Sequence, residues 1–166
     1  KRQSDLILNC VTCDSLEDTP FARSVRSVLS HCRFDSAPRS VGTARLFASD
    51  SADSSAPGVI ELAVQPFVTT TNGYSVSDRL GWVQECLDSM EPFLTGIGSI
   101  AISHRLGGLV RVSEWSSFRD LLDVFAQRHP SVRIVIARTG SDAVHEARRD
   151  HRQAQQSNRK ALNKVR

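Results

Sequence analysis

The chain has 166 residues, 40% of them hydrophobic and 23% charged, which suits one globular domain and excludes a disordered chain. No apolar run approaches the roughly 18 residues that cross a bilayer, which excludes a membrane-spanning helix. The net charge of +3 is uneven, because residues 142–166 hold seven lysines and arginines against three acids; this net +4 leaves the preceding residues at −1.

The first half of the chain alternates short apolar runs with one amphipathic segment. Residues 6–11 predict a buried strand, and Thr19 followed by Pro20 predicts the start of a helix that reaches about residue 32. Further strands are expected at residues 41–48 and 59–64, and a polar low-complexity loop separates them.

The second half continues the alternation. Helical spacing of apolar residues predicts a helix from Ser77 to Met90, and residues 99–103 predict a strand. A third helix is expected over residues 115–128 and a last strand over residues 132–137. Strands that alternate with helices predict an α/β domain in residues 1–140, with a mixed sheet between helices on both faces. Residues 141–166 are expected to form a basic C-terminal extension.

Four cysteines in a chain of this length do not form a disulfide framework, so we expect buried thiols and an intracellular, cytoplasmic location. Cys10 and Cys13 have the spacing of zinc ligands, but no second pair follows at a finger or ribbon interval. We therefore expect no metal and no cofactor. The first residue is Lys1 and no signal peptide is visible, so we expect a processed product or part of a longer chain.

Three stretches together resemble the macro domain family, in particular its terminal ADP-ribose glycohydrolases and ADP-ribose phosphatases. Ile7 to Asp14 is similar to the family strand that ends in a His-Cys-Val-Ser/Asn-x-Asp-type segment. Gly73 to Met90 resembles the helix after the central strand. Ser99 to Gly107, with Glu114-Trp115, resembles the Ser-Ile-Ala-x-Pro strand, Gly-x-Gly loop and acidic-Trp helix start. The resemblance covers roughly residues 5–137 and implies a three-layer macro-domain-like fold, with the family's first strands absent or upstream of the chain.

The resemblance implies two glycine-rich loops that hold the diphosphate of ADP-ribose, since glycine lets backbone N–H groups approach phosphate closely. The first family loop reads Met-Gly-x-Gly-Ile-Ala, and residues 17–22 stand at those positions here. Both glycines are missing, Pro20 has no N–H, and Glu17 and Asp18 bring negative charge towards an anion. We expect this loop to repel a diphosphate.

The second family loop is half retained, as Gly107-Gly108-Leu109-Val110. The catalytic aspartate of the glycohydrolase branch falls at Arg111, and a guanidinium cannot act as a carboxylate acid, base or nucleophile. The lysine which that branch uses covalently has no counterpart in residues 59–80. We therefore do not expect an enzyme.

A functional cleft would use the polar residues that remain at matching positions. Thr12 stands where the family has a ribose-contacting asparagine, and Asp14 matches an acidic position of the same segment. The other candidates are the anion or nucleotide contacts His104, Arg105, Gly107, Gly108 and Arg111. The alternative interpretation of this second group is a solvated loop with ordinary charges.

The basic extension has two interpretations. As an arm for nucleic acid or an acidic partner, it would bind through salt-sensitive phosphate contacts; as a solvated extension, it would bind nothing specifically. The residues that would carry the binding are Arg148, Arg149, Arg152, Arg159, Lys160 and Lys164.

The sequence thus supports three hypotheses of function, in order of preference. The first is a non-catalytic macro-like module with a structural or protein-interaction role, such as a surface or accessory element of a larger viral assembly or virus particle. The second is an ADP-ribose- or nucleotide-binding domain in which Arg105 and Arg111 replace backbone amides as phosphate contacts. The third is an active ADP-ribosyl hydrolase.

Overall fold

The computed structural model describes residues 5–13, 19–35, 37–49, 57–66 and 74–138. The chain divides into a unit of residues 1–136 and a second of residues 137–166, and the description below concerns the first. The bounds predicted for the basic extension, residues 141–166, stay a prediction. In chain order the elements are β1 (Leu6–Thr12), α1 (Pro20–Val28), β2 (Ala44–Phe47), β3 (Gly58–Gln65), α2 (Val76–Met90), η3 (Glu91–Leu94), β4 (Ser99–Ser103), η4 (His104–Gly108), α3 (Trp115–Arg128) and β5 (Arg133–Ala137).

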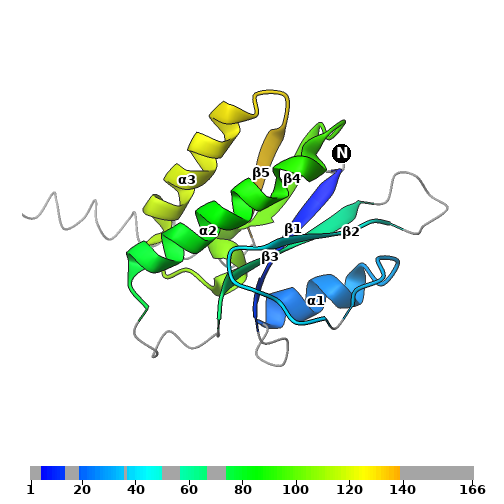
Figure 1. The fold of residues 1–166 in the computed structure, drawn as a ribbon, viewed down its shortest axis with the longest axis horizontal. Helices are drawn as coiled ribbons and strands as arrows, with labels where there is room; N and C mark the ends of the chain where they lie inside the picture. Colours follow the sequence, from blue (N-terminus) through cyan, green and yellow to red (C-terminus); the bar gives the residue numbers. More distant parts are fainter. Residues whose placement is uncertain (1–4, 14–18, 36, 50–56, 67–73, 139–166) are drawn as a thin grey trace, which may run out of the picture. The chain divides into compact units, whose positions relative to one another are not determined.

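The sheet has the strand order β2-β3-β1-β4-β5 (Figure 1). β1 lies in the middle and runs parallel to both β3 and β4, with Leu6 opposite Gly58 on one side and Ile100 on the other. β2 is antiparallel to β3. The predicted mixed α/β sheet is therefore confirmed.

Helices cover both faces of the sheet, as predicted. Alternate residues of a strand point to opposite faces, so Leu8 and Leu62 face α2 and α3 whereas Val11 and Ala63 pack against Ala22 of α1. α2 and α3 lie together on one face and α1 lies on the other (Figure 1). In the part of the chain that the structure describes, no helix is long and apolar enough to cross a membrane.

The helix starts follow local capping chemistry. Thr19 caps α1 and Pro20 occupies its first turn, as the sequence predicts. α2 begins one residue earlier than predicted, because Ser75 and Asp78 form a reciprocal capping box. α1 ends at Val28 instead of reaching residue 32. Serines recur in this helix and favour non-helical backbone, and the Leu29 N–H closes the last turn onto Val25 O at 2.9 Å.

A buried carboxylate ties the α1 side of the sheet together. Glu61 lies in the middle of β3, and its side chain is 2% exposed. Arg26 of α1 binds both carboxylate oxygens, at 2.6 and 2.7 Å. Arg39 binds Oε2 at 3.2 Å and donates to Thr12 O at 2.8 Å. Asn9 of β1 donates to Oε1 at 3.2 Å. One side chain thus joins β1, β3, α1 and the segment before β2.

Replacing Glu61 with alanine removes the carboxylate that two largely buried guanidinium groups share. Breaking a buried ion pair by removing one partner typically costs about 3–5 kcal/mol, so we expect a loss of that size in the free energy of unfolding. Urea denaturation measures it. Asp120→Ala, on the exposed face of α3, is the control and should change stability by less than about 0.5 kcal/mol. Equal losses in the two variants would contradict the role of Glu61.

Candidate functional site

The topology places the switch point of the sheet at the carboxyl ends of β1 and β4. The connection from β1 through α1 leads to β3 on one side, whereas the connection from β4 through α3 leads to β5 on the other. In open α/β sheets, ligands bind where neighbouring connections diverge in this way. The start of α1 and η4 contact each other at this point, and the region where they meet is called the crevice. It is the candidate functional site.

The start of α1 offers few donors to an anion. Pro20 has no N–H, and the N–H groups of Ala22 and Arg23 already donate to Thr19 Oγ1 and Thr19 O, both at 3.1 Å. A helix N-terminus binds phosphate through N–H groups that have no partner inside the helix. Arg23 makes the first ordinary bond of the helix, so the cap takes the Ala22 N–H and proline removes another, which leaves fewer N–H groups at this terminus for an anion.

The opposite wall, η4, has a left-handed backbone. Arg105, Leu106 and Gly107 have φ values of 55°, 51° and 72°, and Gly108 has a φ of 96°. A left-handed conformation costs residues with a Cβ about 1–2 kcal/mol each, so Arg105 and Leu106 are strained. The sequence predicted a loop at the two glycines, but no local pattern signals that the two residues before them share their left-handed conformation.

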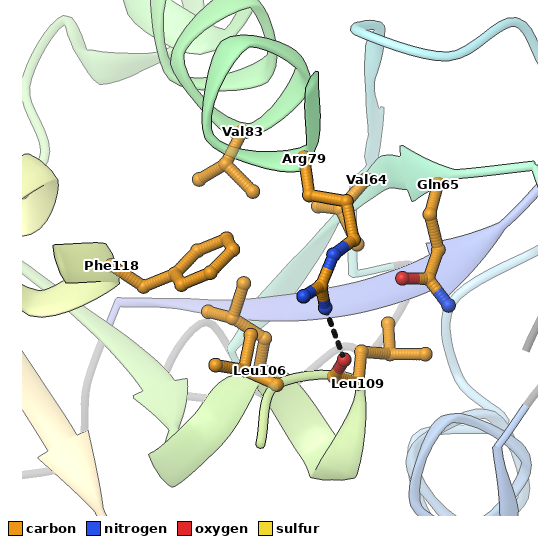
Figure 2. Close-up of a pocket in the computed structure, with 8 residues that line it drawn as sticks. Val64, Gln65, Arg79, Val83, Leu106, Leu109 and Phe118 are labelled. Atoms are coloured by element: carbon orange, nitrogen blue, oxygen red, sulfur yellow. Dashed lines mark hydrogen bonds between the residues drawn. The ribbon is translucent and has the colours of Figure 1, made fainter. Parts of the chain in front are cut away.

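Arg79 of α2 holds the loop after η4 in place. Its Nη2 pairs with Glu114 Oε2 at 2.7 Å, and its Nη1 donates to Leu109 O at 3.5 Å. The guanidinium also lies over the Phe118 ring, 5.8 Å from its centroid. Figure 2 shows Arg79 reaching from α2 towards Leu109, with Val83 and Phe118 beside it. This side chain connects α2, the η4 loop and the start of α3.

The charge on Glu114 is stabilised by this arrangement. Burial raises its pKa, but hydrogen bonds from Arg79 and from the Arg111 N–H outweigh burial and hold the pKa below its usual value. The carboxylate is therefore ionised near neutral pH, and it is engaged by Arg79 and the Arg111 N–H.

The cavity beside Arg79 measures about 10 Å³, which is room for one water molecule and not for a nucleotide.

Phe21 closes the crevice by packing directly on Gly107. A Cβ added to Gly107 would lie 2.8 Å from Phe21 Cδ1 and 3.4 Å from Ser103 Oγ. Real Cβ atoms essentially never approach a neighbour to less than 3.0 Å, so the contact requires glycine. The aromatic ring therefore lies between the start of α1 and η4.

The structure brings His104, Arg105, Gly107 and Gly108 together in one loop, and the side chains of His104 and Arg105 contact neighbouring residues of the protein. Arg105 Nε donates to Val110 O at 3.1 Å. The His104 ring packs edge-on against Trp115, with centroids 4.9 Å apart. Arg111 lies on the surface beyond the loop. The guanidinium of Arg105 thus stabilises its own loop.

Of the other predicted site residues, the structure describes Thr12 and does not describe Asp14 or the basic residues of the C-terminal extension. Thr12 is fully buried at the end of β1, where its carbonyl accepts the hydrogen bond from Arg39. Asp14 and the six basic residues predicted in the C-terminal extension lie outside the part of the chain that the structure describes. The roles predicted for all of these residues stay predictions.

Burial favours the protonated thiol of Cys10, Cys13 and Cys86. Burial raises the pKa of Cys10 to about 12, and it raises the pKa of Cys86 and of the half-exposed Cys13 as well. Metals bind the thiolate form, which burial disfavours here. Within the described ranges, no three histidine, cysteine or acidic side chains are placed to hold a metal ion.

No protein-family model and no curated protein matches the sequence. Solved structures do share its fold. The macrodomain of Mycobacterium tuberculosis DarG is 14% identical, with a TM-score of 0.58 over 80% of this chain and 88% of that one. Alphavirus P23pro-zbd is also 14% identical, with a TM-score of 0.53 over 93% of this chain and 22% of that one, so the chain spans only a small part of that protein. The macro-domain-like fold is therefore confirmed.

The contact between Phe21 and Gly107 can be tested by a double-mutant cycle. Gly107→Ala places a Cβ against the ring, so Phe21→Ala should relieve part of its cost, with a coupling energy of about 1 kcal/mol in the free energy of unfolding. Gly108→Ala is the control, since it has the same left-handed backbone but no atom within 4 Å of the added Cβ. It should couple to Phe21→Ala by less than about 0.5 kcal/mol. Equal coupling at the two glycines would refute the contact.

Proposed function

We propose that this chain is a non-catalytic macro-like module with a structural or protein-interaction role. The observation that supports the proposal is the Phe21 ring packed against Gly107, which joins the start of α1 to η4. A diphosphate between these loops needs backbone N–H groups on both sides, and on the α1 side Pro20 lacks one and Thr19 takes that of Ala22. The module would keep the fold for its surface and stability.

The chemistry around η4 supports the absence of catalysis. Hydrolysis of an ADP-ribosyl bond needs a positioned acid, base or nucleophile. Arg111 stands at the position of the family aspartate, and Glu114, the carboxylate after η4, is bound by Arg79 and the Arg111 N–H. A carboxylate in two such interactions is a poor proton carrier, because its pKa is lowered and its oxygens are occupied.

A second candidate function, binding of ADP-ribose or another nucleotide, is favoured by the strained backbone of η4. Residues in sparsely populated conformations cluster at ligand sites, and Arg105 and Leu106 are two in succession. In addition, Ser103 Oγ is buried beside Gly107 with no hydrogen-bond partner among the described residues. A bound phosphate would have to displace Phe21 and could recruit Arg105 or Arg111.

The partners implied by the first candidate are other proteins of a larger assembly. The alphavirus structure of similar fold is a much longer chain, of which a module like this one is a part. We therefore propose that the module is an accessory element of a virus, located in the cytoplasm of the host cell or in the virus particle. The basic residues after position 140 would add contacts to nucleic acid or to an acidic partner.

Calorimetric titration with ADP-ribose tests the proposal. We expect no heat of binding from the wild-type chain at millimolar ligand and no release of ADP-ribose from a modified protein substrate. The Phe21→Ala variant separates two causes for the absence of binding. If only this variant binds ADP-ribose, the ring blocks the crevice. If neither the wild-type chain nor the variant binds it, the α1 loop has lost its donors.

Micromolar binding by the wild-type chain would contradict the closed crevice and support the second candidate. In that case Arg111→Ala should weaken binding. Turnover of the modified substrate that disappears in Asp14→Asn would overturn the non-catalytic proposal altogether.

A further inference from the structure

Two buried polar atoms on neighbouring strands have no hydrogen-bond partner among the described residues. They are Asn9 Oδ1 in β1 and Ser103 Oγ at the end of β4. Asn9 is 0% exposed and Ser103 is 7% exposed, so neither side chain is solvated by bulk water. Buried side-chain polar atoms nearly always bind protein or an ordered water, so each of these two atoms needs a partner.

The register of the sheet places the two side chains next to each other. Leu8 pairs with Ile102 in the parallel ladder of β1 and β4, so Asn9 and Ser103 are the next residues along the two strands. Leu8 and Ile102 point into the core under α2 and α3, and alternate residues point to opposite faces. Asn9 and Ser103 therefore share the α1 face, on strands about 4.8 Å apart.

Contacts with the first turn of α1 place both atoms at the same point. Asn9 Nδ2 donates to Ala22 O at 3.5 Å. Ser103 Oγ lies 3.4 Å from the position of a Cβ on Gly107, and Phe21 Cδ1 lies 2.8 Å from that same position. Because Phe21 and Ala22 are consecutive, Asn9 Oδ1 and Ser103 Oγ lie beneath one turn of α1, at the floor of the crevice.

The neighbours of Asn9 fix the orientation of its amide. Nδ2 donates to Ala22 O and to Glu61 Oε1, at 3.5 and 3.2 Å. Both partners are acceptors, so a rotated amide would turn its oxygen towards a carboxylate. Asn9 Oδ1 is therefore an acceptor that needs a donor. The Ser103 hydroxyl can donate and accept, but no hydrogen bond joins the two side chains.

We propose that one water molecule binds between Asn9 Oδ1 and Ser103 Oγ. The water donates one hydrogen to Asn9 Oδ1 and makes its second bond with the Ser103 hydroxyl. Two hydrogen bonds of about 2.8 Å each span the separation of polar atoms on adjacent strands that a single bond does not cover. Leaving both atoms unpaired costs more free energy than immobilising one water.

The charges around the site favour water over a cation. The carboxylate next to Asn9 is Glu61, and Arg26 and Arg39 already neutralise it. Asn9 and Ser103 are uncharged, so a buried cation would have no counter-charge to offset its desolvation. The bound water joins β1 and β4 at the switch point of the sheet and gives the crevice a polar floor. This inference does not depend on whether the crevice binds a ligand.

A crystal structure of the chain at about 1.5 Å resolution tests the site without any variant. We expect electron density for one water within about 3.2 Å of both Asn9 Oδ1 and Ser103 Oγ. A direct hydrogen bond between the two side chains would overturn the proposal, and so would the absence of density between them.

Nuclear Overhauser transfer from water tests the site in solution. We expect cross-peaks between water and the Asn9 Hβ protons, with the opposite signs in NOESY and ROESY spectra that mark a water bound for longer than about a nanosecond. Asn9 suits this measurement because it has no hydroxyl whose exchange with solvent would imitate a bound water. Absence of these cross-peaks would contradict the proposal.

Two serine variants assign the partner of the water. Ser103→Ala removes one of its two hydrogen bonds and should weaken the Asn9 cross-peak by threefold or more. Ser99→Ala is the matched control, since Ser99 is also buried on the same face of β4 but lies beyond the pairing position of Asn9. It should leave the cross-peak unchanged. Equal intensities in the two variants would rule out Ser103 as a partner.

Discussion

The contact between Phe21 and Gly107 is the constraint on which the functional end of this molecule depends. The ring packs so closely on the backbone that no Cβ fits between them, which makes glycine necessary for steric as well as conformational reasons. Because the ring belongs to the first turn of α1, the contact also fixes where that helix begins relative to η4. The start of α1 and η4 are thus joined by an aromatic side chain.

Two buried arginine–carboxylate systems, one on each face of the sheet, keep those loops where they are. Glu61 and its two arginines fix α1 on one face, and Arg79 with Glu114 fixes the segment after η4 on the other. Buried ion pairs contribute less to stability than their geometry suggests, because desolvation offsets attraction, but they select one arrangement over others. The strained backbone at Arg105 and Leu106 persists because these contacts surround it.

Much of the fold could be predicted from the sequence, because periodicity and caps are local. The strands at β1, β3, β4 and β5, the Thr19-Pro20 helix start and the three helices follow from residue spacing, and the order of the motifs identified the fold. The left-handed Arg105 and Leu106 could not be predicted, since neither residue favours that conformation. The Arg79–Glu114 pair joins residues far apart in the chain and has no local pattern. Glu61 did carry a signal, since a carboxylate inside the apolar run of residues 59–64 needs a buried cation.

The contact between the two loops also explains why motif comparison could not settle the function. The sequence shows that the first loop has lost its glycines, but only the structure places Phe21 against the glycine that remains in the second loop. The most direct test is a nuclear Overhauser measurement between the Phe21 ring protons and the Gly107 Hα protons. A closed crevice predicts strong cross-peaks and an upfield ring-current shift of Gly107 Hα. An absence of cross-peaks, with Gly107 at random-coil shifts, would contradict the account.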